Sequence, residues 1–150
     1  MDTAPFIIER RFAAPIETVW DALTNRDRMK EWYFDLAEFR AEPGFEFSFE
    51  GGGTDGETFT HLCRVTVADE PSRLAYTWRY EGFPGESIVT FELFPDGAGT
   101  RLRLTHANLH TFRGDINPAL ASSNFAAGWT SILDSSLAPY LERTTTQASA

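Results

Sequence analysis

The sequence has little cysteine and little positive charge, and it lacks any long hydrophobic run. Its one cysteine, Cys63, cannot form a disulfide within the chain. With 13 Lys and Arg against 22 Asp and Glu, the formal net charge is −9. This balance argues against binding to nucleic acid or to anionic lipid surfaces, because both need clustered basic side chains. No run approaches about 18 apolar residues, so we expect no transmembrane helix.

The start of the chain also lacks the basic region and apolar stretch of a secretory signal. Together with the single cysteine, this predicts a soluble, cytoplasmic protein. Aromatic residues, by contrast, are plentiful: they make up 14% of the 150 residues, including 13 Phe and 4 Trp. A chain of this length is expected to form one domain, which we place at residues 1–143, with a disordered tail at 144–150.

The first part of the chain predicts one strand followed by two short helices. Phe6–Phe12 is typical of a strand, and Pro15 stands where helices often begin. Asn25 is suited to cap a second helix over residues 26–32. The first helix would bury the apolar residues that recur at helical spacing: Ile16, Val19, Trp20 and Leu23.

Five segments between residues 45 and 106 alternate between apolar and polar side chains, which is the pattern of half-buried strands. Turn sequences rich in Gly, Pro and Asp separate them, which predicts an antiparallel meander. The residues expected to face inward are Phe45, Phe47 and Phe49; Phe59, His61, Cys63, Val65 and Val67; Leu74, Tyr76, Trp78 and Tyr80; Val89, Phe91 and Leu93; and Leu102, Leu104 and His106.

The last third of the chain predicts one long amphipathic helix over Pro118–Glu142, after a loop over Thr111–Asn117. Its apolar residues recur at three- and four-residue steps and fall on one face: Phe125, Trp129, Ile132, Leu133, Leu137, Tyr140 and Leu141. A single long helix that closes a strand-rich domain needs a sheet to lie across. When that sheet is curved, a pocket can remain between the two, and this pocket is the main clue to function.

This order of elements and four phrases of the sequence resemble the SRPBCC superfamily, also called START-like or helix-grip. The phrases are Ala14–Leu23, Pro71–Trp78, Val89–Leu93 with Gly99–His106, and Gly128–Asp134. Within the superfamily the chain is similar to the homologues of the activator of heat-shock-protein-90 ATPase. That family usually has a tryptophan pair where this chain has Trp32 and Tyr33.

The resemblance implies an α+β helix-grip fold, in which a curved antiparallel sheet of six to seven strands wraps around a long C-terminal helix. It implies a cavity between sheet and helix but carries no universal catalytic residues. The residues that we expect to line this cavity are Trp32, Tyr33, Phe47, His61, Cys63, Tyr76, Trp78, Phe91, His106, Phe125, Trp129 and Leu133, with Asn108 as a further candidate.

Other readings of these polar residues are weaker. His61, Cys63, His106 and His110 are possible metal ligands, but no CxxC, HxxxH or HExxH spacing is present, so we expect no metal and no cofactor. Cys63 would need a lowered pKa to act as a nucleophile, and a buried cysteine is the commoner case. No catalytic residue is predicted.

Three functions follow as hypotheses. The first is a binding module for a small apolar or amphipathic molecule, oriented by a hydrogen bond from His61, Tyr76 or His106. The second is a chaperone co-factor that would use the outer surface. The third is an enzyme of the cyclase or hydrolase type, with His61 and Tyr76 as the candidate acid–base pair. The sequence leaves monomer and homodimer open.

Overall fold

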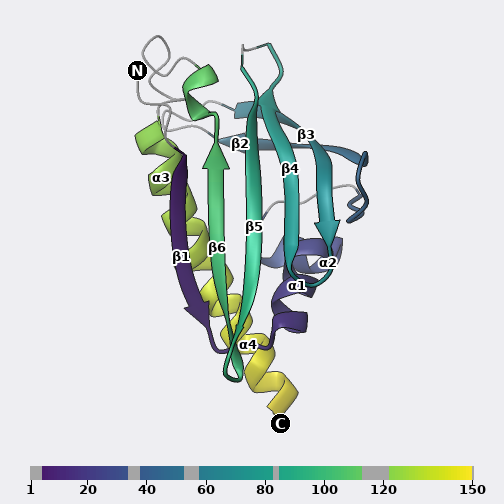
Figure 1. Cartoon of the computed structure of the whole chain (residues 1–150), viewed down its shortest axis with the longest axis vertical. Helices are drawn as coiled ribbons and strands as arrows, with labels where there is room; N and C mark the ends of the chain where they lie inside the picture. Colours follow the sequence, from purple (N-terminus) through teal and green to yellow (C-terminus); the bar gives the residue numbers. More distant parts are fainter. Residues whose placement is uncertain (1–4, 34–37, 53–57, 83–84, 113–121, 150) are drawn as a thin grey trace.

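The computed structural model describes residues 5–33, 38–52, 58–82, 85–112 and 122–149. These form an open antiparallel sheet with a long helical segment behind it, as the sequence predicted (Figure 1). The elements in chain order are β1 (Phe6–Phe12), α1 (Ile16–Thr24), α2 (Arg26–Trp32), β2 (Glu46–Gly52), β3 (Thr58–Asp69), β4 (Arg73–Tyr80), β5 (Ser87–Asp96), β6 (Gly99–Ala107), η1 (Leu109–Phe112), α3 (Ser122–Ser131), η3 (Ile132–Leu137) and α4 (Ala138–Ser149).

The sheet has six strands in the order β1-β6-β5-β4-β3-β2, and each neighbouring pair is antiparallel. Strands β2 to β6 form the predicted meander, while β1 pairs with the last strand, so β1 and β2 are the two edges. The C-terminal helical segment crosses one face of the sheet, and α1 and α2 lie behind it near one end (Figure 1). This is the helix-grip α+β fold expected from the sequence.

The two short helices begin and end where the sequence indicates. The backbone N–H of Asp27 donates to the side chain of Asn25 at 3.0 Å, which caps α2 as expected. The Trp32 indole donates to the carbonyl oxygen of Ala22 at 2.8 Å and so ties α2 back to α1. This bond fixes the end of α2, where Tyr33 turns toward the sheet.

Strand β3 departs from the predicted alternation at a β-bulge. The register between β3 and β4 shifts between Val65 and Val67, so Val65 pairs with Tyr76 whereas Val67 pairs with Ala75. One extra residue in β3 turns every later side chain to the other face of the sheet. The expectation that Val67 faces inward is therefore wrong, and Ala68 packs against the core in its place.

The C-terminal helical segment contains a π-helical stretch, η3, that the sequence analysis did not foresee. In a regular α-helix four residues rotate by about 400°, so residues spaced by four drift about 40° per step around the helix. The wider turn of η3, closed by a bond from the Ala138 N–H to the Leu133 carbonyl, offsets that drift. It keeps five residues spaced by four buried on one face: Phe125, Trp129, Leu133, Leu137 and Leu141.

The C-terminal end of this segment extends further than the predicted helix, which ended at Glu142. The start expected at Pro118 lies outside the described residues. The backbone of α4 is helical to Ser149, where we expected a disordered tail from Thr144. Extending a helix that packed turns have already nucleated costs little, so the backbone can continue as a helix past Glu142. The predicted loop from Thr111 begins in the short helix η1.

Candidate functional site

The candidate site is the layer of side chains between the concave face of the sheet and the C-terminal helical segment. Of the twelve residues expected to line a cavity, eleven are buried and Tyr33 is partly buried. The structure therefore brings them into one cluster, and their role as a lining stays a prediction. Asn108 does not join them, because it is exposed and its φ of 66° ends β6 in the left-handed region.

The cluster is made largely of aromatic rings in contact with one another. Trp129 on α3 lies against Tyr33, Trp78 and Phe91, with ring centroids 6.2, 5.6 and 6.0 Å apart. Phe47 meets Tyr76 edge to face at 5.1 Å. Offset and edge-to-face pairs of this kind stabilise beyond the area that they bury. The helix is thus held to β4 and β5 by ring contacts of Trp129, and further ring contacts join β4 to β2.

Two tyrosine hydroxyls meet inside this cluster. The hydroxyl oxygens of Tyr33 and Tyr76 are 2.7 Å apart, which joins the end of α2 to the middle of β4. Burial raises the pKa of both hydroxyls well above the ordinary value. Both therefore remain protonated at neutral pH, and the pair is a neutral hydrogen-bonding group.

His106 is held by a chain of hydrogen bonds from three elements. The Trp129 indole N–H donates to Nδ1 of His106 at 2.9 Å, so Nδ1 carries no proton. A neutral imidazole then has its proton on Nε2, which donates to Oγ of Ser87 at 2.7 Å. Ser87 in turn donates to the carbonyl oxygen of Trp78 at 2.9 Å. Both ring nitrogens are used, and burial lowers the pKa of His106 to about 3.

His61 lies at the β2–β3 side of the cluster. Its ring stacks on Phe49 at 4.5 Å and meets Trp78 and Tyr80 at 4.9 and 4.7 Å. The Trp78 indole N–H donates to the Tyr80 hydroxyl at 2.9 Å, and burial raises the pKa of that hydroxyl. His61 and Tyr76 were the expected acid–base pair, but each has other neighbours. Tyr76 shares a hydrogen bond with Tyr33, and His61 packs among aromatic rings.

Cys63 is buried, as expected for a cysteine that packs as a small apolar side chain. Burial raises the pKa of its thiol, so the thiolate that a nucleophile or a metal ligand needs is disfavoured. Among the residues that the structure describes, no three His, Cys, Asp or Glu side chains gather as metal ligands. The side chain of His110, the remaining candidate ligand, lies outside the described part.

Several members of the cluster were not in the predicted lining, among them Phe49, Tyr80 and Ser87. Phe49 and Tyr80 alternate with residues that the prediction did include, Phe47 and Trp78, and the same period-two pattern could have added them. Ser87 stands two residues before Val89 on the inward face of β5 and is fully buried. Its bond to His106 had no sequence signal, because the partner comes from another strand.

The inner layer is uncharged. Among the described residues, the buried polar side chains are two histidines and three hydroxyl residues, with no Asp, Glu, Lys or Arg: His61, Thr77, Ser87, Thr100 and His106. A buried charge without a partner is costly, so a charged guest would find no compensation here. The layer is suited to neutral aromatic or apolar groups.

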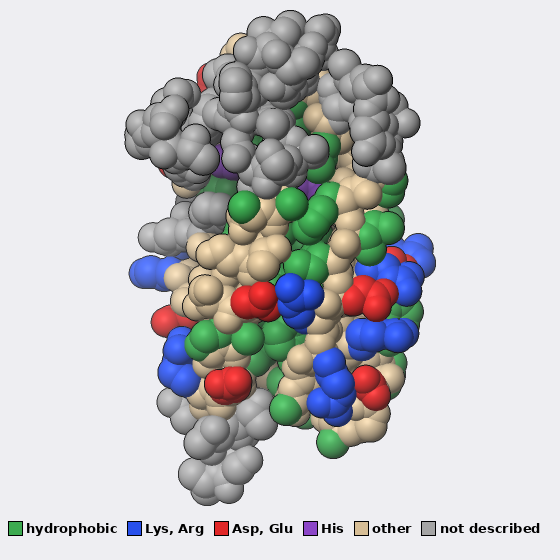
Figure 2. Space-filling view, turned by 90° about the vertical axis from the view of Figure 1, so that its left-hand side faces the viewer, with side chains coloured by type: hydrophobic (Ala, Val, Ile, Leu, Met, Phe, Trp, Pro, Cys, Tyr) green, Lys and Arg blue, Asp and Glu red, His purple; other side chains and the backbone are tan. Residues whose placement is uncertain are grey.

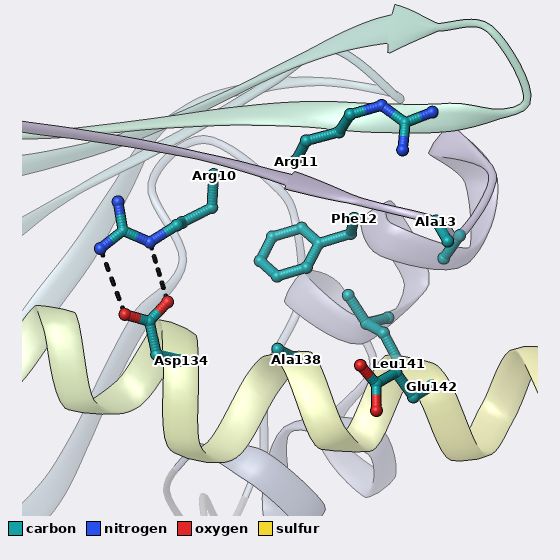
Figure 3. A pocket seen from close by; sticks show the side chains of 9 residues that line it. Arg10, Arg11, Phe12, Ala13, Asp134, Ala138, Leu141 and Glu142 are labelled. Atoms are coloured by element: carbon teal, nitrogen blue, oxygen red, sulfur yellow. Dashed lines mark hydrogen bonds and ion pairs between the residues drawn. The ribbon is translucent and has the colours of Figure 1, made fainter.

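Two hollows lined wholly by described residues lie outside this layer. One, of about 100 Å³, opens where β3 and β4 part and the Arg64 N–H donates to the Thr77 hydroxyl instead of a strand carbonyl. The other is a groove of about 450 Å³ between the end of β1 and the C-terminal helix, with Phe12 and Leu141 at its floor (Figure 3). Arg10 closes one end through two bonds to Asp134, at 2.8 and 3.1 Å.

The side of the molecule that carries this groove is mixed in character. Hydrophobic side chains show along the seam between the edge strand and the helix, and charged side chains flank them (Figure 2). The four charged residues of the groove are two arginines and two acids, Arg10, Arg11, Asp134 and Glu142. The groove therefore favours neither sign of ligand charge. No helix of the described part is long and apolar enough to span a bilayer.

Comparisons with known proteins agree with this architecture. The model of a family described as "Activator of Hsp90 ATPase homolog 1-like protein" matches residues 13–142. A search of curated proteins finds no match. Among solved structures, the chain is similar to CalU16 from Micromonospora echinospora, with 27% identity and a TM-score of 0.71 over 95% of this chain and 79% of that one.

Two further solved structures show the same fold. Protein MLL2253 from Mesorhizobium loti is 28% identical, with a TM-score of 0.74 over 93% of this chain and 98% of that one. DynU16, from the dynemicin biosynthetic locus, is 18% identical, with a TM-score of 0.73 over 99% of this chain and 49% of that one. This chain therefore matches about half the length of DynU16.

Proposed function

This chain belongs to the family of activator of Hsp90 ATPase homolog 1-like proteins, and on that premise we propose that it binds a small, uncharged, largely aromatic or apolar molecule between its sheet and its C-terminal helix. The observation that carries the proposal is the inner layer of aromatic rings and neutral hydroxyls. Ligand sites in proteins are mostly apolar, with a few polar groups that orient the guest.

The polar groups of the inner layer indicate what they can recognise. The hydroxyls of Tyr33 and Tyr76 share a hydrogen bond in which either can be the donor, and when Tyr33 donates, the hydroxyl hydrogen of Tyr76 can turn to a guest. Because burial keeps both hydroxyls protonated, the favoured acceptor is a carbonyl or ether oxygen of a neutral molecule. The rings of Phe47, Trp78 and Trp129 would stack on its flat parts.

The same groups favour binding over acid–base catalysis. A general base needs a pKa near the working pH and a free lone pair within reach of its substrate. His106 uses both ring nitrogens within the protein, and burial holds its pKa far below neutrality. Because burial raises its pKa, the Tyr76 hydroxyl gives up its proton less readily, and the phenolate that could act as a base is not populated at neutral pH; the hydroxyl can still donate a hydrogen bond.

The similar structures support a small organic guest in one respect. DynU16 comes from a biosynthetic locus and shares this fold. Because the likeness is one of fold, it suggests small organic molecules as a class of guest and identifies no specific ligand.

The first test is native mass spectrometry of gently purified protein. An added mass that denaturation removes would reveal a bound molecule and give its mass. The second test uses a neutral fluorescent probe, N-phenyl-1-naphthylamine, with anionic anilinonaphthalene sulfonate as the charged comparison. We expect the neutral probe to bind more tightly, because the described residues of the inner layer include no buried cation to meet the sulfonate.

Two variants connect that binding to the site. Trp78→Ala should weaken probe binding, since it removes a ring at the centre of the cluster. Tyr76→Phe keeps the ring and removes the hydroxyl, and it should weaken binding of probes that carry an acceptor oxygen. Tyr140→Phe is the matched control, because it also removes one buried tyrosine hydroxyl, which faces Arg28 and lies outside the Tyr33–Tyr76 pair. Equal effects of the two tyrosine changes, or a bare mass with no probe binding, would overturn the proposal.

The family's name gives a second candidate, a co-factor that stimulates the ATPase of heat-shock protein 90. Membership in the family is the observation that favours it. It would use the outer surface, so Trp78→Ala should leave it intact if the variant folds. Failure to bind that chaperone or raise its ATPase rate at high concentration would exclude it.

A further inference from the structure

None of the described helices covers the outer face of the sheet. In Figure 1 strands β1, β6, β5, β4 and β3 lie in front of the C-terminal helix, and no described element lies over them. The side chains of this face stand in rows that run across the strands, because antiparallel partners lie directly opposite one another. The strand registers give the composition of each row.

One row alternates in charge across five strands. Its members are direct strand partners in the order Glu9, Arg103, Glu92, Arg73 and Asp69. Within the molecule, Arg103 bonds to Glu9 and Arg73 lies 3.6 Å from Glu92. The signs are thus negative, positive, negative, positive and negative from β1 to β3; we name this the charge row.

The next row along the strands has no charge at all. Its members are again direct partners: Ile7, Thr105, Thr90, Ala75 and Val67. Ile7 is 55% exposed, and Ile88, one row further, is 37% exposed. These two are the large hydrophobic side chains that stand exposed among the described residues, and both lie on this face. Ala75, by contrast, is buried between its neighbours, so the uncharged row has a projecting side chain and a recessed one.

We propose that this face is a dimer interface, in which a second copy of the chain packs with its outer face against the first. The two-fold axis would lie between the two facing sheets, parallel to the strands and above the gap between β5 and β6. It places β6 of one copy opposite β5 of the other, and β1 opposite β4. It sets Arg103 of each copy opposite Glu92 of the other, and Glu9 opposite Arg73. In the uncharged row Ile7 meets the recessed Ala75, and in the row beyond it Ile88 meets Ala107. Both exposed isoleucines are thereby covered.

The charge row selects this axis. A two-fold axis across the strands and through the charge row would set each charge against its own copy, which is repulsive. The same axis through the uncharged row would set Arg103 and Glu92 against Ala107 and Ile88, so both charges would lose water without an opposite charge in the facing copy. Of these axes, one parallel to the strands places opposite charges of the two copies against each other. Its position between β5 and β6 covers both exposed isoleucines, Ile7 and Ile88.

Sedimentation velocity over a concentration series tests the proposal with paired charge reversals. Glu92→Arg makes positions 92 and 103 both positive, and Arg103→Glu makes both negative. Each variant alone should dimerise at least about tenfold more weakly than the natural chain. Mixed in equal amounts, the two variants should associate more strongly than either alone, because each reversed position then meets the opposite sign across the interface.

The mixing result separates an interface from damage within the chain. A variant weakened only by its broken internal pairs would gain nothing from the other variant. Glu31→Arg on the exposed surface of α2 is the matched control for net charge and should leave association unchanged. Ile7→Ser with Ile88→Ser should weaken it. A monomer at all concentrations up to about 1 mM, or a dimer indifferent to Glu92→Arg, would overturn the proposal.

Discussion

The two faces of one sheet differ in what holds them together. Tyr76 and Thr77 are neighbours in β4, yet the first belongs to a layer of aromatic rings and the second to the face turned away from the helix. The inner layer buries no Asp, Glu, Lys or Arg among the described residues, whereas the outer face carries the alternating charge row. Period-two alternation thus divides the same strands into an uncharged inner layer and a polar surface.

This difference separates the source of stability from the means of recognition. Ring contacts and area removed from water stabilise the inner layer, and these terms are large and insensitive to salt. The pairs of the charge row stand in water, where solvent and ions screen them. Substitutions on the inner face should therefore change folding, whereas substitutions on the outer face should change association and leave folding nearly intact.

The largest contrast is expected between Trp129→Ala and Ile88→Ala. The first removes a ring that touches Tyr33, Trp78 and Phe91 and leaves Nδ1 of His106 without its donor, so it should cost about 3–5 kcal/mol of unfolding free energy. The second trims an exposed side chain and should stay within about 0.5 kcal/mol. Urea unfolding at micromolar concentration measures both. Similar losses of unfolding free energy in the two variants would show that both faces of the sheet contribute equally to stability.

The next effect is a loss of stability in acid that comes from the inner face. His106 has a pKa of about 3 in the folded protein against an ordinary 6.5, because burial disfavours its charged form. Below pH 6.5 the unfolded chain therefore binds a proton that the folded protein does not. Stability from this group is complete above pH 6.5 and falls as the pH drops toward 3, by about 2–3 kcal/mol at pH 4.5.

Urea unfolding between pH 8 and pH 4 measures that loss, and His106→Gln is its control. Glutamine keeps an amide that can accept from Trp129 or donate toward Ser87, but it does not titrate in this range. The variant should be less stable at pH 8 and should have a flatter pH profile than the natural chain. Parallel profiles would mean that the surface carboxylates, and not His106, cause the acid sensitivity.

Much of the inner face could be predicted from the sequence. Alternation in the strands placed Phe47, Tyr76 and Trp78 in the interior, and helical periodicity placed Trp129 and Leu133 opposite them. Such local patterns report which way a side chain faces, because the period of a strand or helix is fixed by its backbone geometry. The capping by Asn25 was equally local and equally predictable.

The rest depends on relations between distant residues. The bulge in β3 is one extra residue relative to β4, so no pattern within β3 alone reveals it. The bond chain from Trp129 through His106 to Ser87 joins three elements, and only the assembled fold brings them together. The π-helical stretch is visible in the sequence, because apolar residues spaced strictly by four do not fit the α-helical period of 3.6 residues. A closer reading of that spacing could have found it.

The smallest effect is expected from the outer face, at the pair of Glu9 and Arg103. The two are bonded at 2.6 Å, and the pKa of Glu9 is lowered by Arg103, yet both side chains are largely in water. An exposed pair gains little over its separate hydration, so Glu9→Gln should move the melting temperature by under about 2 °C. The same change should weaken self-association, because it removes the partner of Arg73 in the facing copy. Calorimetry at low concentration and sedimentation at high concentration would separate the two readouts. A large loss of folding stability in Glu9→Gln, with unchanged association, would contradict the conclusion that the outer face serves association and the inner face serves stability.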